Sequence, residues 1–341
     1  MKARTQVTKA TRLCDSGRRA RWCDALLALT LLVIPACDRP AERPPSSIAA
    51  TTSSTAPASA QTASRVPDRV LVPNVDLGEA GAGPARIVSL APSATEFCCA
   101  LGLRERIVGR TRYCDYPPGV EAIVDLGTAH DLSAERLLTL HPDLILVTGT
   151  TRGHTDRLAG LGLAWRTLPD GSLADIYRSI DALGEWTSRP RTATALAAAI
   201  REDVEQVAAR HRGGPRRRVL LVVSVLSDPP APPTVAGPGS FYDELMRMAG
   251  IINAAPEDGR DFGPLSLEAI LTADPEFIIE LDPDGAARPA GEADARVAWG
   301  RIGPLRAVRE GRVRVLVGNQ HYVPGPRIAQ TFDAICRALD R

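Results

Sequence analysis

Short apolar runs alternate with amphipathic stretches along most of the chain. Arg86–Leu90 is a short apolar run that predicts a buried strand, and Ser93 with Glu96 forms a capping-box pattern that predicts the start of a helix, which Gly102 ends. A second strand is predicted over Ile107–Gly109. Strands that alternate with helices in this way indicate an α/β fold with parallel pairing.

The same pattern occurs a second time in the chain. Residues 132–147 and 265–280 are identical at seven of sixteen positions, at a constant offset of 133. Each copy predicts a capped helix, a turn that contains proline, and a buried strand, which covers Leu144–Val147 in the first copy and Phe277–Leu281 in the second. Solenoid periods are about 20–50 residues, so this larger offset indicates a duplicated lobe.

An alanine-rich and charged stretch lies between the two copies. Residues 189–212 combine strong helix formers, and Gly213-Gly214-Pro215 follows them, which predicts one long helix with a sharp end. We therefore predict an α/β fold of two lobes, each with a small parallel sheet flanked by helices, joined by one long rigid interlobe helix. The expected boundaries are 86–187 for lobe one, 188–212 for the linking helix and 216–341 for lobe two.

The first 37 residues have the features of an export signal. Residues 1–24 hold seven basic and two acidic residues, and the apolar run Ala25–Ile34 is too short to span a bilayer. Ile34-Pro35-Ala36-Cys37 resembles a bacterial lipobox, in which the cysteine receives a lipid; an ordinary signal cleaved nearby is the alternative. Residues 38–85, rich in Pro, Ala, Ser and Thr, predict a disordered tether. We expect an exported protein, periplasmic or on the outer face of the cytoplasmic membrane, with a lipid anchor on Cys37.

The composition excludes several classes of protein. Lys2 and Lys9 are the only lysines, so nothing beyond them can form a Schiff base or serve as a phosphate-loop lysine. The chain contains no G-x-x-x-x-G-K-[ST], G-x-S-x-G or H-E-x-x-H motif, and its five histidines show no metal-ligand spacing. The net charge is +1, but the residues after position 24 carry −4, which argues against a nucleic-acid partner. We expect neither an enzyme nor a resident cofactor.

Four cysteines fall within the predicted lobes, at positions 98, 99, 114 and 336. Cys98 and Cys99 are adjacent and point to different sides of the predicted helix, so they would not pair with each other. One disulfide among the four remains open, and buried, inert thiols are the alternative.

The motifs of the lobes resemble those of a known family. The motifs in question are Arg86-Ile-Val-Ser-Leu-Ala-Pro-Ser-Ala-Thr-Glu96, Arg112-Tyr-Cys-Asp-Tyr-Pro-Pro118, Leu132-Ser-x-Glu135, Leu265-Ser-x-Glu268 and Gly325-Pro-Arg327. They are similar to those of the periplasmic binding proteins with a helical backbone, which deliver corrinoids, ferric siderophores and haem to ABC importers. The Tyr-x-Asp-Tyr-Pro-Pro segment resembles the vitamin B12-binding branch. The resemblance implies a monomer that works with an ABC permease and its ATPase.

Two glutamates match positions that the family uses for docking. A glutamate at the tip of each lobe forms salt bridges with arginines of the membrane permease in this family, and Glu135 and Glu268 occupy those positions here. Both fall in the predicted first turn of equivalent helices. Stabilisation of the helix N-terminus by a negative side chain is the alternative explanation, and the two roles are compatible.

The resemblance also implies a ligand site at the carboxyl ends of the strands, where open α/β sheets bind ligands. The implied ligand-binding residues are Tyr113, His130, Thr148, Phe241, Phe262, Asn319, His321 and Tyr322. In the B12-binding branch a tyrosine at the position of Tyr113 packs on the corrin ring, and a tryptophan occupies the position of Phe262. Its first-lobe tryptophans are replaced here by Ala129 or His130 and by Thr148. The ligand so implied is a tetrapyrrole-like metal chelate, cobalamin or a related cobalt corrinoid.

Other readings of the same residues stay open. A ferric-siderophore or haem receptor predicts arginines such as Arg112 in the site. Separately, one histidine from each lobe, His130 and His321, is a candidate to ligate cobalt or haem iron, with ordinary loop histidines as the alternative. An exported metal-dependent enzyme and a ligand sensor without a permease are further possibilities. We expect three tryptophans outside these loops to be packing residues: Trp165, Trp186 and Trp299.

Overall fold

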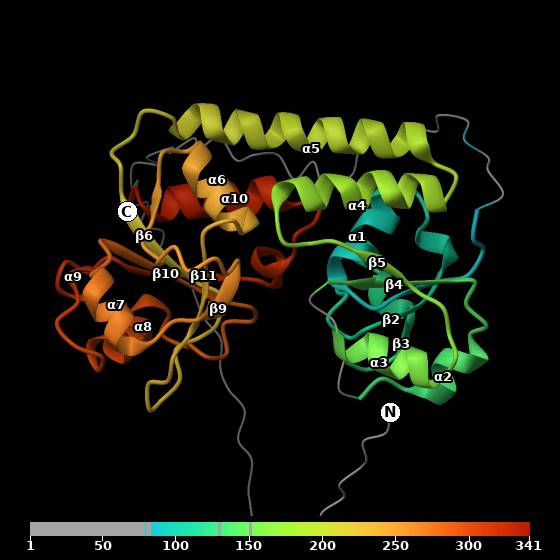
Figure 1. Ribbon diagram of the computed structural model, residues 1–341, viewed down its shortest axis with the longest axis horizontal. Coiled ribbons are helices and arrows are strands. Elements are labelled where there is room, and N and C mark those ends of the chain that lie inside the picture. Colours follow the sequence, from blue (N-terminus) through green and yellow to red (C-terminus); the bar gives the residue numbers. More distant parts are fainter. Residues whose placement is uncertain (1–78, 80–82, 129–130, 150–151) are drawn as a thin grey trace, which may run out of the picture. The chain divides into compact units, whose positions relative to one another are not determined.

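The structure is a computed structural model that describes residue 79 and residues 83–128, 131–149 and 152–341. Its first sheet has five strands, all parallel, in the order β3-β2-β1-β4-β5. The strands are β1 (Ile87–Ser89), β2 (Ile107–Arg110), β3 (Val124–Asp125), β4 (Leu144–Thr148) and β5 (Arg166–Leu168). The helices are α1 (Pro92–Ala100), α2 (Ala134–Thr139), α3 (Arg152–Gly160) and α4 (Leu173–Trp186), with 3₁₀ turns η1 (Arg104–Arg106) and η2 (Val120–Ala122). Figure 1 shows their arrangement.

The second sheet follows the order β11-β10-β6-β7-β9, and β8 also pairs with β6. The strands are β6 (Arg218–Val222), β7 (Thr234–Ala236), β8 (Ile252–Asn253), β9 (Phe262–Pro264), β10 (Phe277–Asp282) and β11 (Val313–Val317). The helices are α6 (Phe241–Met248), α7 (Leu267–Ala273), α8 (Glu292–Gly300), α9 (Arg306–Arg309) and α10 (Ile328–Ala338), with the 3₁₀ turn η3 (Asn319–Tyr322).

The α/β fold predicted from the sequence is confirmed, with one correction to the second sheet. Strand β7 is antiparallel to both β6 and β9, so this sheet is mixed and not wholly parallel as expected. The chain passes from β6 to β7 without a helix. A parallel pairing needs a long crossover, usually helical, whereas an antiparallel pairing can be closed by a loop.

Helix α5 (Pro190–His211) is the long helix predicted between the two repeats. Its 22 residues make a helix of about 33 Å. It packs against α4 from the first half and α10 from the second (Figure 1). Glu79 covers its N-terminus: the two carboxylate oxygens accept hydrogen bonds from the amides of Arg191, at 2.7 Å, and Thr192, at 3.0 Å. Glu79 belongs to the segment predicted as a tether, and this residue contacts the folded part of the chain.

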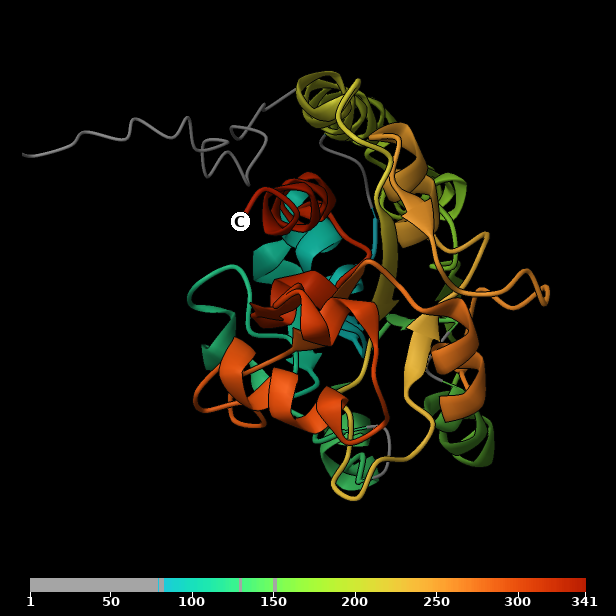
Figure 2. The ribbon, with the colours of Figure 1, turned by 90° about the vertical axis from the view of Figure 1, so that its left-hand side faces the viewer.

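Apolar side chains alternate between two faces in both sheets. Ile87 on β1 and Ile279 on β10 belong to one large core that both halves share, together with α1, α4, α5, α6 and α10. Val88 belongs to a separate core under α2, and Ile278 to another under α7, α8 and α9. Figures 1 and 2 show α5 and α10 on one side of the second sheet and α7 and α8 on the other. Each sheet is thus covered on both faces, as its short, almost wholly apolar strands require.

The start of α1 differs from the prediction. The helix begins at Pro92, with Ala91 as the N-cap residue and no side-chain cap, so Ser93 and Glu96 do not form a capping box. Proline is well suited to the first helical position because it lacks the amide hydrogen that would be unsatisfied there. Glu96 instead is buried and binds Arg327, which precedes α10 in the other half: Arg327 Nε donates to Oε2 at 3.0 Å and Nη2 donates to Oε1 at 2.5 Å.

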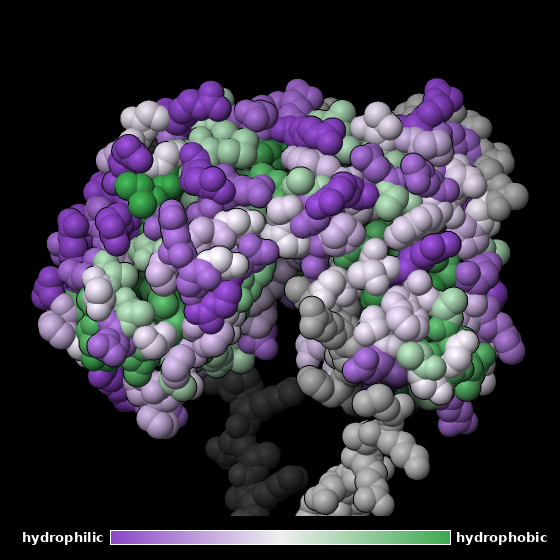
Figure 3. Space-filling view, in the orientation of Figure 1, coloured by the Kyte–Doolittle hydropathy of each residue, from purple (hydrophilic) through white to green (hydrophobic). Residues whose placement is uncertain are grey.

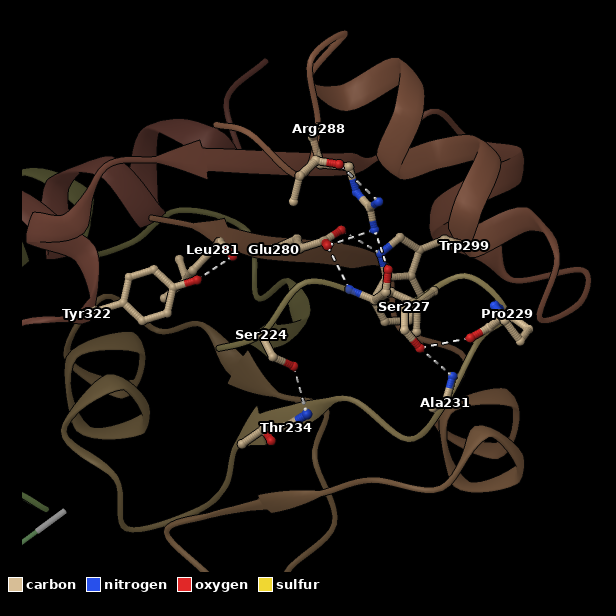
Figure 4. Close-up of polar contacts among 12 residues, drawn as sticks. Ser224, Ser227, Pro229, Ala231, Thr234, Glu280, Leu281, Arg288, Trp299 and Tyr322 are labelled. Atoms are coloured by element: carbon tan, nitrogen blue, oxygen red, sulfur yellow. Dashed lines mark hydrogen bonds and ion pairs between the residues drawn. The ribbon is translucent and has the colours of Figure 1, made fainter. Parts of the chain in front are cut away.

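A second buried ion pair joins strand β10 to the loop that follows it (Figure 4). Glu280 on β10 is fully buried, and Oε1 of its carboxylate accepts from Nη2 of Arg288 at 2.9 Å and from the amide of Leu226 at 2.9 Å. Its Oε2 accepts from the indole nitrogen of Trp299 at 3.0 Å. These contacts hold together the loops that follow β6 and β10.

The remaining predictions about packing concern the tryptophans and the cysteines. Trp299 is fully buried, and Trp165 and Trp186 pack against apolar cores, as expected of packing residues. The four cysteines of the described residues are free and buried, and burial raises the pKa of each thiol. They match the alternative of inert thiols, because the thiolate is the reactive form.

The export signal and Cys37 lie outside the described residues. Within the part of the chain that the structure describes, no helix is both long and apolar enough to cross a membrane.

Candidate ligand site at the carboxyl ends of the sheets

The strand order of the first sheet creates a switch point at the carboxyl ends of its strands. Strands β2 and β4 lie on opposite sides of β1, so the connections after β1 and after β4 leave the sheet in opposite directions. Crevices form at such switch points. In the space-filling view the surface is hollowed between the part that carries the first sheet and the part that carries the second (Figure 3).

Tyr113 is presented by the loop that follows β2. Its side chain is 58% exposed, whereas the adjacent Cys114 is buried, with its amide donating to the carbonyl of Thr111 at 3.0 Å. The amide group of Asn319, after β11, donates to the carbonyl of Tyr113 at 3.1 Å and to the carboxylate of Asp115 at 3.1 Å. Two residues predicted to share a ligand site, one from each half, are therefore in contact.

Three aromatic side chains form a second group in this region. The rings of Phe241 and Tyr242 have centroids 3.9 Å apart, and each lies 6.1 Å from the ring of Phe262. Phe241 is buried in the shared core, and Phe262 is only partly covered. Of the two phenylalanines predicted from the sequence, Phe262 can thus offer surface to a ligand, while Phe241 supports it from behind.

Tyr242 lies next to Phe241 but is not among the eight predicted ligand-binding residues. It is fully buried beside Phe241, and its hydroxyl donates to the carbonyl of His321. Burial raises the pKa of this phenol, so it stays protonated and keeps donating. The Ser240 side chain accepts a hydrogen bond from the amide of Asp243 and caps α6. The sequence signal is an N-cap serine followed directly by two aromatic residues, which predicts the start of a helix but not the direction of either ring.

The turn η3 holds His321 inside the protein. The side chain is 7% exposed, with Nδ1 at 3.4 Å from the hydroxyl of Thr331 and Nε2 at 3.3 Å from the amide nitrogen of Gln320. The Thr331 hydroxyl donates to the carbonyl of Gln320. Nδ1 of His321 is therefore the donor, and Nε2 accepts from the Gln320 amide. Both ring nitrogens are in use within the protein.

The other predicted residues fall in different environments. Tyr322 is partly buried, and its hydroxyl donates to the carbonyl of Leu281 at 2.5 Å. Thr148 is buried at the carboxyl end of β4. His130 lies outside the described residues. Among the residues that are described, no group of three or more His, Cys, Asp or Glu side chains is placed to hold a metal ion.

Because His321 is buried, we expect the protein to lose stability in acid. Burial, with Arg327 nearby, lowers the pKa of the imidazole to about 4. The unfolded chain takes up a proton near pH 6.5 whereas the folded protein does not, so the free energy of unfolding falls by about 3 kcal/mol between pH 7 and pH 4. Urea denaturation across this range measures the loss, and His321→Asn should have a shallower pH dependence than the wild type.

The matched control is His141→Asn, which removes an exposed histidine. His141 has a positive φ of 43°, a conformation that asparagine tolerates. Its pH dependence should follow that of the wild type. An equally steep curve for His321→Asn would show that this buried imidazole does not contribute.

The two predicted docking glutamates occupy equivalent places. Glu135 is exposed in the first turn of α2, which Ser133 caps by accepting from the amide of Arg136. Glu268 is exposed in the first turn of α7, which Ser266 caps in the same way. Neither carboxylate has an ion-pair partner among the residues described.

Comparison with known proteins gives a consistent result. An ABC transporter substrate-binding lipoprotein of Bacillus subtilis is 26% identical over 75% of this chain and 80% of its own length. A vitamin B12-binding protein of Vibrio cholerae is 24% identical over 74% of this chain and 88% of its own length. The apo structure of the periplasmic haem-binding protein RhuT from Roseiflexus superposes with a TM-score of 0.62 at 26% identity, covering 75% of this chain and 98% of that one.

These similar proteins are binding proteins, which confirms the expectation of a protein that is not an enzyme. The family described as periplasmic binding protein matches residues 87–318, more than half of the sequence. That range begins at β1 and ends after β11, so it includes both sheets and the helix between them. The chain therefore belongs to the periplasmic binding protein family.

Proposed function

We propose that this protein is the extracytoplasmic solute-binding component of an ABC importer and that its ligand is cobalamin or a related corrinoid. The choice of ligand rests on the similarity to vitamin B12-binding proteins along both halves of the fold. The exposed ring of Tyr113 near the carboxyl end of β2 supports it. A corrinoid is broad and flat, and exposed aromatic faces match such a surface.

Two aromatic groups would contact the ligand, one from each half. Tyr113 supplies an exposed ring on a loop that Asn319 holds from the other half. Phe262 supplies a partly exposed ring supported by Phe241 and Tyr242. Tyr322 and Thr148 shape the surface near the strand ends. We assign His321 to the support of this region, because its ring nitrogens bind Thr331 and Gln320.

Delivery of the ligand requires contact with a membrane permease and its ATPase. We propose that Glu135 and Glu268 make this contact, since both are exposed at equivalent places in the two halves. We further propose that residues 1–37 direct export and that Cys37 carries a lipid. The similarity to a Bacillus substrate-binding lipoprotein supports this anchoring.

Haem is the second candidate ligand. It is also a flat metal chelate, and the similarity to a haem-binding protein at 26% identity favours it. Haem differs from cobalamin in its two carboxylates, which basic side chains bind. Arg112 is the candidate for this role. Its guanidinium lies 3.6 Å from the carboxylate of Asp131 in an exposed ion pair, and a ligand carboxylate would take the place of Asp131.

Calorimetric titration of the purified protein with cyanocobalamin tests the proposal, with haem and a ferric siderophore as comparisons. We expect one-to-one binding of cyanocobalamin in the micromolar range or tighter. Tyr113→Ala should weaken it at least tenfold, about 1.4 kcal/mol, because the exposed ring is lost.

Tyr113→Phe is the matched control for this ring. It keeps the aromatic face and should bind like the wild type. Binding of haem alone would replace the corrinoid by the second candidate and leave the importer role intact. Wild-type affinity of Tyr113→Ala would remove Tyr113 from the site.

A further inference from the structure

The identical positions of the internal repeat can be sorted by what the fold requires of them. Seven pairs are identical between residues 132–147 and 265–280. Four pairs have plain structural roles, as buried side chains, N-cap residues or turn prolines: Leu132 and Leu265, Ser133 and Ser266, Pro142 and Pro275, Ile145 and Ile278. The repeat preserves these because both halves build the same helix, turn and strand.

A fifth pair is also explained by the helices themselves. Thr139 donates its hydroxyl to the carbonyl of Arg136 at 2.8 Å, and Thr272 donates to the carbonyl of Glu268 at 2.9 Å. Both hydroxyls thus satisfy backbone groups near the end of a short helix. Two pairs remain, Glu135 with Glu268 and Leu138 with Leu271.

The two leucines have no comparable role in capping or turning the helices, although the side chain of Leu271 lies against Gly303. Leu138 is 45% exposed and Leu271 is 40% exposed, and they are the leucines among the exposed large apolar side chains of the described residues. The preceding residues, Leu137 and Ile270, are fully buried and attach each helix to its core. A polar residue at 138 or 271 would cost the fold little, yet both halves have leucine.

Each leucine lies beside the glutamate of its own helix. Residues three apart share one face of a helix, so Glu135 and Leu138 on α2 point the same way, as do Glu268 and Leu271 on α7. Both helices pack on the face of their sheet that is turned away from the shared core. The two halves therefore present the same pair, a carboxylate with an isobutyl group.

We propose that Leu138 and Leu271 are apolar anchors of the permease-docking surface, each acting with the glutamate of its own helix. This inference rests on the proposed importer function. The partner it implies offers, at two equivalent places, a basic side chain next to an apolar one. A partner built from two copies of one subunit presents two such places by symmetry.

The physical reason for an apolar anchor is the weakness of exposed ion pairs. A carboxylate and a guanidinium that stay in water gain little from each other and are screened by salt. An apolar side chain that becomes buried alongside the pair adds the hydrophobic contribution and excludes water from the charges. Glu135 and Glu268 would orient the complex, and the two leucines would lengthen its lifetime.

Stimulation of ATP hydrolysis by the permease–ATPase complex of the source bacterium, in proteoliposomes, tests the proposal. Leu138→Ser/Leu271→Ser should raise the half-maximal concentration of binding protein at least tenfold, and each single variant by about threefold. The melting temperature and cyanocobalamin affinity of the double variant should equal those of the wild type. Val297→Ser is the matched control, because Val297 on α8 is 61% exposed and lies outside the repeat.

Charge reversal separates the two levels of the proposal. Glu135→Arg/Glu268→Arg should abolish stimulation. If it does so while the leucine double variant stays like the wild type, docking through the glutamates stands and the leucine anchors are overturned. If the wild-type protein gives no stimulation, or charge reversal leaves it unchanged, the docking role itself fails and the leucines with it.

Discussion

Replacement of Arg327 by leucine is expected to lower the free energy of unfolding by about 3–5 kcal/mol. Glu96 is 4% exposed and Arg327 is 9% exposed, so the variant leaves a carboxylate in the interior without its counter-charge. Burial alone raises the pKa of Glu96, and the guanidinium opposes this shift. The guanidinium carbon also lies 3.9 Å from the ring centroid of Tyr116, a cation–π contact that is lost as well.

Urea denaturation of three further variants identifies the cause. Arg327→Lys keeps the charge but not the two-pronged hydrogen bonding, and should lose less stability than Arg327→Leu. Glu96→Gln combined with Arg327→Leu should be less destabilised than the sum of the two single changes, because no charge is then left unpaired. Arg260→Leu breaks an exposed pair with Asp258 and should lower the free energy of unfolding far less than Arg327→Leu does. An equal cost for Arg327→Leu and Arg260→Leu would refute the importance of the buried pair.

The second large effect is expected at the other buried pair. Arg288→Leu removes the counter-charge of Glu280, which is fully buried. The change should lower the free energy of unfolding by about 3–5 kcal/mol. Arg288 Nη2 also donates to the carbonyl of Leu226 at 2.8 Å (Figure 4). Its loss therefore releases the loop after β6, where the chain turns toward the antiparallel strand β7.

Hydrogen exchange distinguishes release of this loop from a general loss of stability. The amide of Leu226 donates to Glu280, and its hydrogen exchange should accelerate more than that of amides in β10. Glu280→Gln is the companion variant: it stays able to accept from the indole of Trp299 and should lose less stability than Arg288→Leu. If the amide hydrogen of Leu226 exchanges at the wild-type rate in Arg288→Leu, Arg288 does not hold this loop in place.

Much of the fold is predictable because its signals are local. The N-caps Ser133 and Ser266, the apolar strands of the repeat and the alanine-rich helix α5 all appear where the sequence places them. The capping box at Ser93 failed because Pro92 starts the helix earlier and because Glu96 binds a residue 231 positions away. No local pattern contains a partner at that distance.

The candidate site was predictable in its loops but not in the direction of its side chains. Tyr113 and Asn319 were expected near one another, and they are in contact. His321 was expected to face a ligand, yet Thr331 in α10 and the hydroxyl of Tyr242 hold its turn inward. Such orientations depend on tertiary hydrogen bonds, which residue types and spacing do not reveal.

The core shared by the two halves has a consequence for how the protein unfolds. Side chains from β1, α5 and α10 belong to one continuous cluster, so neither half can lose its packing without exposing apolar surface of the other. We therefore expect the two halves to unfold as one cooperative unit, and a ligand bound between them to stabilise both. Wide separation of the halves would break this cluster, so we expect the capture of a solute to involve only small movements of one half against the other.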